Sequence, residues 1–215
     1  MRSEDIHQVV RILKHEIRRW PVPALAKYVE TPFTVLIACI LSLRTQDRTT
    51  LAASDRLFAI AATPGSMLAV PVRKVERVIY PVSFYRTKAR TIHAICEQLL
   101  SRYDGEVPSD LDELLALPGV GRKTANIVVT LGFEKPGIAV DTHVHRISNR
   151  LGYVRTRSPE KTEMSLRRKL PPRYWIVFND LLVAYGQNLC KPVSPHCSTC
   201  KIATYCNRVG VKTSR

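Results

Sequence analysis

The residues best suited to chemistry in this chain are four cysteines near its C-terminal end, Cys190, Cys197, Cys200 and Cys206. Their spacing, C-x6-C-x2-C-x5-C, brings four thiols close together along the chain. Four thiolates can bind zinc or an iron–sulfur cluster. A zinc site commonly has two C-x2-C pairs separated by a longer insert, whereas here one pair is flanked by single cysteines. The spacing therefore favours a cluster over zinc and leaves zinc open.

The same four cysteines could instead form two disulfides. We expect free thiols, because nothing before Ser3 resembles a signal peptide and disulfides are rare inside cells. Two further cysteines, Cys39 and Cys96, lie in the apolar stretches TVLIACIL and TIHAICEQLL. A thiol in such surroundings usually packs as a small core residue, so neither is predicted to bind metal.

Composition narrows the class of partner. The chain has 215 residues, with 33 Lys and Arg against 18 Asp and Glu, a net charge of +15 and a pI near 9.9. Such an excess of positive charge favours a polyanion, and nucleic acid is the leading candidate. The longest apolar run, 35–41, is too short to cross a bilayer, and no segment sets Lys and Arg opposite an aromatic stripe. We therefore expect a nucleic acid as the partner and no membrane. We also expect an intracellular, cytoplasmic protein that acts as a monomer.

Helical periodicity runs through the chain and no convincing strand pattern is present, which predicts an all-α fold. The first helix is expected to start after Ser3 and to end before Pro21, and a second to follow Thr31-Pro32 with a mostly apolar surface. A turn-rich stretch, 132–137, is the one weak signal of a boundary. The remaining helices are predicted at 47–61, 66–69, 72–79, 87–103, 109–117, 122–131, 142–151, 159–169 and 174–188.

The stretch LPGVGRKTA, residues 117–125, separates a helix that we expect Ser109 to cap from the helix that follows. Gly119 and Gly121 are predicted to provide unusual backbone angles and a bare surface. The open N-terminus of the second helix could hold a phosphate, and Arg122 adds positive charge beside it. An ordinary helix corner is the alternative; in so basic a chain, the pattern indicates a helix-hairpin-helix element that grips DNA phosphates.

Two residues near these turns could carry catalysis. Lys123 lies in the first turn of the second helix, where the helix dipole disfavours a cation and so favours a nucleophilic amine, although a phosphate contact is the commoner use of such a lysine. Asp141 follows a short apolar run in IAVDTHVHR. It could simply cap the next helix, or also present a carboxylate that stabilises developing positive charge or removes a proton.

Taken together, LPGVGRKTA, GFEKPGIAVDTH and the four-cysteine loop resemble the endonuclease III family of helix-hairpin-helix DNA glycosylases. The resemblance implies a two-lobed all-α fold with a helical barrel lobe at 25–135 and a discontinuous iron–sulfur lobe made of 1–24 and 136–215. It also implies a [4Fe-4S] cluster on the four cysteines.

The reaction that the resemblance implies is base excision from double-stranded DNA, on a damaged nucleotide rotated out of the duplex. Lys123 would attack the sugar, a Schiff base would form, and elimination would nick the strand at the resulting abasic site, with Asp141 assisting departure of the base. The implied substrate is a damaged, oxidised pyrimidine. The enzyme would be a bifunctional DNA glycosylase and AP lyase.

Further positions carry over from the family to a DNA-contacting role. Phe84 in SFYRTKA matches an apolar wedge that enters the duplex, with Tyr85 beside it, although core packing is an equal alternative. Ser42 and Asp47 in LSLRTQD match a lesion-pocket segment, but Arg44 stands where relatives commonly have Gln, which leaves the substrate range open. Gln46, two residues after Arg44, is a further expected DNA contact. The same group of expected DNA contacts includes His143 and Lys191.

Two other functions remain compatible with the sequence. One is a glycosylase of the same fold that removes uracil or mismatched thymine without using Lys123 covalently. The other is a non-catalytic DNA-binding protein in which zinc on the four thiolates serves as a structural staple.

Overall fold

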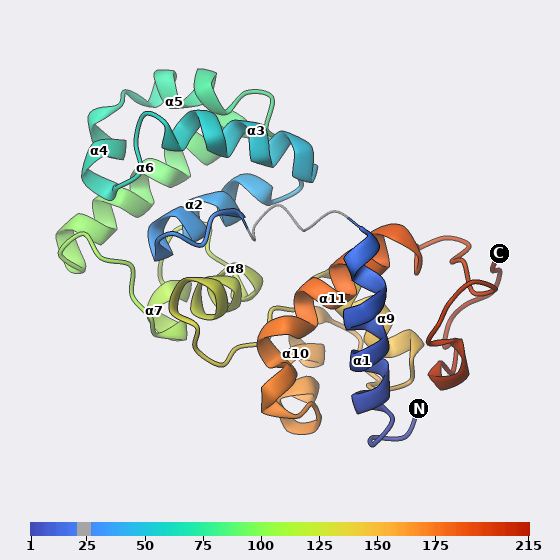
Figure 1. Cartoon of the computed structure of the whole chain (residues 1–215). Helices are drawn as coiled ribbons and strands as arrows, with labels where there is room; N and C mark the ends of the chain where they lie inside the picture. Colours follow the sequence, from blue (N-terminus) through green and yellow to red (C-terminus); the bar gives the residue numbers. More distant parts are fainter. Residues whose placement is uncertain (21–26) are drawn as a thin grey trace. The chain divides into compact units, whose positions relative to one another are not determined.

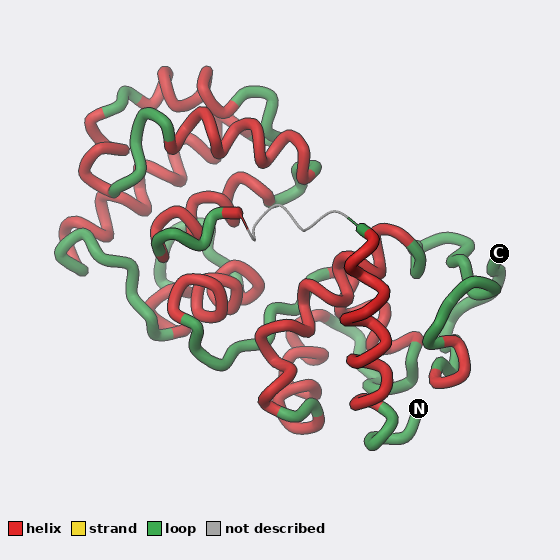
Figure 2. The backbone as a smooth tube through the Cα atoms, viewed as in Figure 1, coloured by secondary structure: helices red, strands yellow, loops and turns green. Residues whose placement is uncertain are grey.

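The computed structural model describes residues 1–20 and 27–215. In these two ranges all regular secondary structure is helical and no strand is present (Figure 2), as the periodicity predicts. The chain divides into two compact units, one formed by Ala24–Lys135 and the other by Met1–Pro23 together with Pro136–Arg215. The boundary between Lys135 and Pro136 falls inside the turn-rich stretch 132–137. Pro21, before which the first helix is expected to end, lies outside the described residues.

The continuous unit is a set of helices packed around α2. Figure 1 shows α2 between α3 and α6 on one side and α8 on the other, and α2 contacts all three helices. Its helical elements in chain order are α2 (Pro32–Ser42), α3 (Asp47–Phe58), α4 (Pro64–Ala69), α5 (Val72–Ile79), α6 (Tyr85–Arg102), α7 (Leu111–Leu115), α8 (Arg122–Ile127) and the π-helix η3 (Val128–Gly132).

Helix α2 forms the centre of this unit because its sequence is apolar on nearly every side. All residues from Phe33 to Leu41 are buried, Thr34 included. A helix that is apolar all round is stable only when other elements surround it, so α3, α6 and α8 must pack on it. Thr31 starts the helix with a capping box, in which its hydroxyl accepts from the Thr34 N–H, and Pro32 occupies the first turn.

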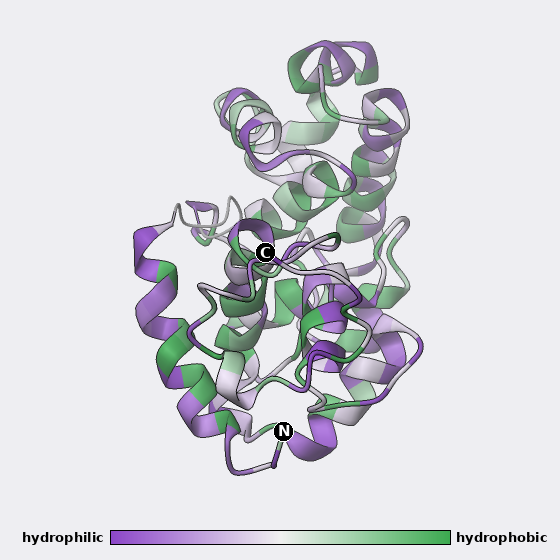
Figure 3. Ribbon diagram, turned by 90° about the vertical axis from the view of Figure 1, so that its right-hand side faces the viewer, coloured by the Kyte–Doolittle hydropathy of each residue, from purple (hydrophilic) through white to green (hydrophobic). Residues whose placement is uncertain are grey.

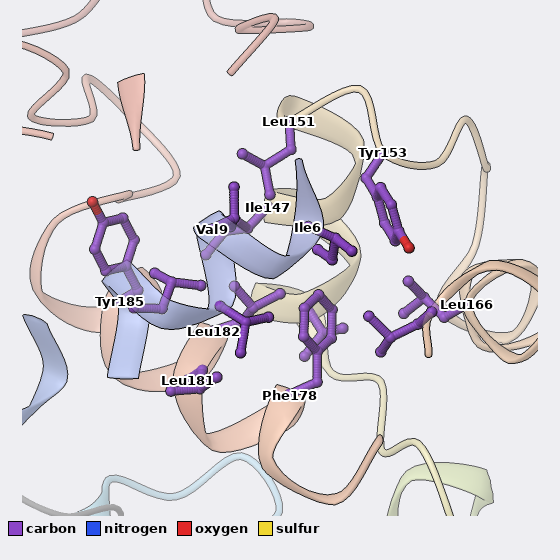
Figure 4. Packing of buried hydrophobic residues seen from close by; sticks show 14 of the residues in the cluster. Ile6, Val9, Ile147, Leu151, Tyr153, Leu166, Phe178, Leu181, Leu182 and Tyr185 are labelled. Atoms are coloured by element: carbon purple, nitrogen blue, oxygen red, sulfur yellow. The ribbon is translucent and has the colours of Figure 1, made fainter. Parts of the chain in front are cut away.

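The second, discontinuous unit is organised around the pair α9 and α11. Its elements are α1 (Ile6–Glu16), the 3₁₀ turn η1 (Ile17–Arg19), α9 (Thr142–Arg150), α10 (Pro159–Lys169), the 3₁₀ turn η4 (Pro172–Tyr174), α11 (Trp175–Asn188) and the 3₁₀ turn η5 (Ala203–Tyr205). Figure 4 shows its core, in which α1 contributes Ile6 and Val9, α9 contributes Ile147, and α11 contributes Phe178 and Leu182. The apolar face of α1 thus packs on a helix more than 130 residues later in the chain.

Helix boundaries differ from the sequence predictions in a few places. Asp5, not Ser3, occupies the N-cap of α1, and its side chain makes no capping bond. Asp110, not Ser109, caps α7, because its carboxylate accepts from the Asp112 and Glu113 N–H groups at 2.8 and 3.1 Å. Ser109 instead accepts from the Lys135 ammonium at 2.6 Å. An acidic N-cap can satisfy two backbone donors at once, which gives Asp110 the advantage.

Most helices carry both hydrophilic and hydrophobic stretches (Figure 3), as expected of amphipathic helices around a core. Cys39 and Cys96 are buried at 1% and 0% exposure, and burial raises the pKa of each thiol to about 12. Their prediction as core residues is confirmed. Across the described residues, no helix has the length and apolar character that a transmembrane span requires.

Candidate functional site

The hairpin between α7 and α8 is a tight turn over Leu117–Val120. The Val120 N–H donates to the Leu117 carbonyl at 3.2 Å, Pro118 occupies the second position, and Gly119 has a φ of +72°. This combination of proline followed by a left-handed glycine is typical of a type II turn. Leu117 and Val120 are buried on either side of the turn, so the exposed tip is held by the core beneath it.

The two glycines of the hairpin have different roles. At Gly119 a side chain is excluded twice, because φ is positive and a Cβ would lie 2.8 Å from the Thr91 methyl group. Gly121 has φ −98° and ψ 172°, which any residue adopts, and no atom would lie within 4 Å of a Cβ. The prediction that both glycines supply unusual backbone angles is therefore wrong for Gly121. The surface at Gly121 is open within this chain. That a DNA backbone approaches it stays a prediction.

Lys123 lies in the first turn of α8, as predicted. Gly121 is the N-cap, and the Ala125 N–H donates to its carbonyl at 2.9 Å. The lysine is half-buried, and it is close enough to Cys39 on α2 that its positive charge opposes the effect of burial on the pKa of that thiol. Arg122, beside it, is also half-buried, and its carbonyl accepts from the Asn126 amide at 3.0 Å.

Asp141 is the N-cap of α9. Its Oδ1 accepts from the His143 and Val144 N–H groups, both at 2.8 Å, so the capping role is confirmed. The side chain is only partly buried, and Oδ2 takes no part in the cap. The cap therefore fixes the direction of the carboxylate while leaving one oxygen outside the helix.

The residues around Asp141 are held by α11. Asn179 on α11 donates to the Ala139 carbonyl at 3.0 Å, two residues before Asp141. Arg146 lies 3.0 Å from His143 Nδ1 and donates to the Cys190 carbonyl at 2.9 Å. The structure thus ties the first turn of α9, which carries Asp141 and His143, to the end of α11 where the cysteine loop begins.

The segment expected to contact the lesion begins at the C-terminal end of α2. The Ser42 hydroxyl donates to the Cys39 carbonyl at 2.8 Å, within the helix. Gln46 is exposed at the N-cap of α3, and Asp47 is the first residue of that helix. Arg44 is exposed with a left-handed φ of +55°, so it turns the chain between α2 and α3.

Phe84 lies on the surface. It is 61% exposed with a φ of +57° and forms the N-cap of α6, so the alternative of core packing is wrong. Tyr85 is half-buried and packs edge-on against Tyr80, with ring centroids 5.4 Å apart. The Arg44 guanidinium lies 5.7 Å from the centre of the Phe84 ring. The two expected DNA contacts, from segments forty residues apart, are therefore neighbours within one unit.

Sequence reasoning missed several residues that support these segments. Lys88 on α6 is buried, and burial lowers its pKa to about 8. Arg56 on α3 donates to the Val78 and Tyr80 carbonyls at 2.8 and 2.6 Å. The sequence could have indicated Lys88, because it lies four residues before Ile92 on the apolar face of α6. A lysine among buried apolar residues is unexpected unless it has a specific partner.

The four C-terminal cysteines line one pocket. The cavity between the lining side chains has a volume of about 30 Å³ and opens to solvent, and all four cysteine side chains are partly buried around it. The other lining residues are mostly apolar and come from α9, α11 and the C-terminal segment: Ile147, Arg150, Leu151, Tyr185, Leu189, Pro195, Ile202, Ala203, Arg208 and Val211. All six cysteines of the chain lie among the described residues, and none of them forms a disulfide in the structure.

Polar groups approach three of these thiols, and the first is Cys206, whose Sγ accepts from the Arg208 N–H at 3.4 Å. Arg150 donates to Cys190 Sγ at 3.4 Å and to the Lys191 and Pro192 carbonyls at 2.7 and 2.6 Å, so it orders the start of the loop to Cys197. The Lys191 side chain itself is exposed. The Tyr185 hydroxyl lies 3.2 Å from Cys200 Sγ. Burial raises the pKa of both Cys200 and Cys206, so metal binding there must displace protons.

The described residues contain no group of three or more His, Cys, Asp or Glu side chains arranged to hold a metal ion. What the structure does show is four cysteines around one mainly apolar pocket with a guanidinium at its edge. An apolar, partly closed surround limits the access of water to a metal centre.

A protein-family model, related sequences and solved structures all match this chain. A family model described as "HhH-GPD superfamily base excision DNA repair protein" matches residues 37–172. Endonuclease III of Thermotoga maritima is 44% identical over 199 residues, which cover 92% of this chain and 92% of that protein. The chain belongs to the HhH-GPD superfamily.

Solved structures extend the likeness to the whole fold. A non-covalent endonuclease III–DNA complex matches with a TM-score of 0.86 at 37% identity and covers 97% of this chain and 96% of that one. A trapped endonuclease III–DNA covalent intermediate, an estranged-adenine complex, also matches with a TM-score of 0.86, at 36% identity over 97% of both chains. As a superfamily member of the endonuclease III type, this chain is a base excision repair glycosylase and lyase.

Proposed function

We propose that this protein removes damaged pyrimidines from double-stranded DNA and then cleaves the strand, with Lys123 as nucleophile and Asp141 as its acid–base partner. The single observation that carries the proposal is the covalent endonuclease III–DNA intermediate, which matches this chain at a TM-score of 0.86. A covalent intermediate requires a nucleophile on the protein. Lys123 is the amine that the helix-hairpin-helix motif offers, half-buried in the first turn of α8.

In the proposed reaction the Lys123 amine attacks C1′ of the deoxyribose, and the C1′–N bond to the base breaks. The departing base takes the bonding electron pair and is protonated, while the attacking nitrogen loses a proton. Asp141 would stabilise the positive charge that develops on the sugar and accept that proton through Oδ2. Ring opening gives an imine to Lys123, and loss of a C2′ proton then expels the 3′ phosphate.

The local structure supports these roles. The cap on α9 fixes the direction of the Asp141 carboxylate relative to its own helix, and a preoriented carboxylate stabilises developing charge with little reorganisation. Gly121 and the turn at Gly119 leave the N-terminal end of α8 uncovered, where we expect the phosphates next to the lesion, with Arg122 nearby. The net charge of +15 suits a polyanionic partner. We place the enzyme with the DNA inside the cell and expect it to act as a monomer.

Covalent trapping tests the nucleophile. Borohydride reduces an imine to a stable amine, so wild-type protein should crosslink to a duplex that contains an abasic site. Lys123→Gln should not crosslink, whereas Lys74→Gln, which removes an exposed lysine from α5 of the same unit, should crosslink like wild type. Trapping of Lys123→Gln, or excision by that variant at the wild-type rate, would assign the protein to the glycosylases that do not use this lysine covalently.

The substrate is tested with duplexes that carry thymine glycol, dihydrouracil, uracil or thymine opposite guanine. We expect faster excision of the two oxidised or reduced pyrimidines. Preferential excision of uracil or mismatched thymine would replace the proposed substrate class while leaving the fold and family unchanged.

We propose in addition that Cys190, Cys197, Cys200 and Cys206 hold a [4Fe-4S] cluster. The donor set, four thiols around one mainly apolar pocket, fits such a cluster. When bound, the cluster would supply a structural centre that positions the C-terminal loops of the second unit. Purified protein should be brown, with about four iron atoms per chain; colourless protein that contains one zinc would show the alternative, a zinc staple.

A further inference from the structure

Arg44 and Phe84 form an exposed pair in the first-described unit. Both residues have left-handed backbone angles, with φ of +55° and +57°, and both side chains face solvent. A left-handed conformation is unfavourable for any residue with a side chain. Two adjacent residues held in this way indicate that the surrounding structure fixes them, and such strain often marks a functional position.

A single buried ammonium joins the two segments that carry this pair. Lys88 is 6% exposed and donates to the Leu41 carbonyl at 2.8 Å, the Leu43 carbonyl at 2.6 Å and the Thr45 hydroxyl at 3.1 Å. Leu41 and Leu43 lie at the C-terminal end of α2, where the helix dipole is negative and carbonyls lack helical partners. Lys88 therefore caps α2 from α6, four residues after Phe84.

Thr45 completes the link between the two segments. Its hydroxyl oxygen accepts from Lys88 and also from the Ser83 N–H at 3.3 Å, and it lies 3.2 Å from the Leu43 carbonyl. Thr45 directly follows Arg44, and Ser83 directly precedes Phe84. One hydroxyl and one ammonium thus fix the backbone on either side of the exposed pair.

We propose that Lys88 is a positioning residue that holds Arg44 and Phe84 together as one probe, which enters the duplex where the damaged nucleotide has left. This inference rests on the proposed function. An aromatic ring can stack on the flanking bases, and a guanidinium can donate to the acceptor edge of the base left without a partner. Neither side chain could reach its base reliably if its loop moved independently of the other.

A purely structural role for Lys88 predicts a different result. If the ammonium only stabilises α2, its loss lowers the amount of folded protein and affects every substrate equally. If it acts through Phe84, its loss affects duplex substrates and has no further effect once Phe84 is gone. A double-mutant cycle separates these two cases, because residues that act through one another are not additive.

The experiment compares Lys88→Met, which keeps the length and apolar stem, with Thr45→Val, which keeps the ammonium and its two carbonyl acceptors. Each is made in the wild-type and the Phe84→Ala background and assayed well below its unfolding temperature. The readouts are kcat/KM on a dihydrouracil duplex, borohydride trapping on a single-stranded abasic oligonucleotide, and the fluorescence of 2-aminopurine placed opposite the lesion, which rises when that base is unstacked. Lys74→Met controls for the loss of one positive charge from the same unit.

We expect Lys88→Met to lower kcat/KM on the duplex by about tenfold or more and to abolish the 2-aminopurine signal, while single-strand trapping stays within about twofold of wild type. Thr45→Val should lower the duplex rate and the signal in the same direction by a smaller factor. In the Phe84→Ala background both substitutions should change the duplex rate by less than about twofold.

Equal losses in the two backgrounds, or equal losses on duplex and single strand, would overturn the positioning role. Thr45→Val keeps the inference testable if Lys88→Met does not fold, because a wild-type signal in folded Thr45→Val would also overturn it. Failure of the proposed function would look different: wild-type protein would then neither excise the base nor be trapped by borohydride.

Discussion

Replacing each hairpin glycine with alanine should separate folding from DNA contact. At Gly119, alanine must adopt a φ of +72°, which costs about 1–2 kcal/mol, and its Cβ would lie 2.8 Å from the Thr91 methyl group. Relieving a contact of that kind typically costs about 1–3 kcal/mol. Alanine also lowers the conformational entropy of the unfolded chain, which stabilises the folded protein by about 0.4–1 kcal/mol. We therefore expect Gly119→Ala to lower the free energy of unfolding by about 2–4 kcal/mol.

For a chain of this size, 1 kcal/mol corresponds to about 2–4 °C in Tm, so Gly119→Ala should unfold about 4–16 °C below wild type by circular dichroism. Gly121→Ala is the matched control, because its backbone suits alanine and no atom lies within 4 Å of the new Cβ. Its Tm should stay within about 2 °C of wild type. Adding Thr91→Ser to Gly119→Ala removes the clashing methyl and should restore only the steric part of the loss.

Equal Tm shifts for the two alanine variants would refute this reasoning, as would a double variant no more stable than Gly119→Ala. DNA affinity provides the second measurement. If phosphates approach the backbone at Gly121, Gly121→Ala should weaken binding to an abasic duplex at one fixed salt concentration without altering Tm. Unchanged affinity would place the DNA backbone elsewhere on α8.

Two further predictions test single carboxylates. Asp141→Asn keeps an N-cap acceptor, so it should remain as stable as wild type while losing most excision activity. Asp141→Ala should lose excision activity and also about 1–2 kcal/mol in the free energy of unfolding, as measured with urea. An active Asn variant would count against a carboxylate in the reaction. Hydrogen bonds from Lys27 and Tyr28 lower the pKa of Asp55, so its ionised form is favoured in the folded state. A lowered folded pKa stabilises at pH above the unfolded value, 3.8, and the stabilisation is lost as pH falls through the folded value. Asp55→Asn should therefore be less stable than wild type at pH 7, by at most about 1 kcal/mol because the Lys27–Asp55 ion pair is exposed. The difference in stability should vanish in acid. A difference that persists at pH 2 would show that it does not come from ionisation of Asp55.

The helices were largely predictable because apolar periodicity and start signals agree. Val72–Ile79 and Pro159–Lys169 have the predicted bounds, and Thr31 followed by Pro32 starts α2 as expected. Errors concentrate at ends, where several nearby side chains can compete for the same cap. Asp110 prevails over Ser109 because one carboxylate oxygen reaches two N–H groups.

The change of helix type after Ile127 was not predictable from the pattern. Residues 122–131 read as one helix, but the structure changes to a π-helix at Val128–Gly132. Gly132 lies against Pro32 of α2, where a Cβ would be 3.1 Å from the Pro32 Cα. Apolar periodicity predicts which residues of a helix face inward. It does not predict where two backbones approach each other closely.

The candidate site could be predicted in its residue types but not in their supports. Lys123, Asp141 and the cysteines are recognisable because the chemistry restricts which side chains can serve. Lys88 and Arg56 act through carbonyl oxygens that are distant in sequence, at Leu41 and Tyr80. Every residue has a carbonyl, so no pattern of residue types can show which ones a buried cation will find.

Several candidate functional residues also hold the fold together, and this affects how loss of activity must be interpreted. Asp141 caps α9, Gly119 forms the hairpin turn and Lys88 caps α2. Loss of activity in an alanine variant at any of them therefore has two possible causes. The informative substitutions remove the chemistry and keep the structural bond, as Asn does for Asp141, or keep the chemistry and remove the link, as Thr45→Val does for Lys88. Only when such a pair diverges can the lost activity be assigned to the reaction itself.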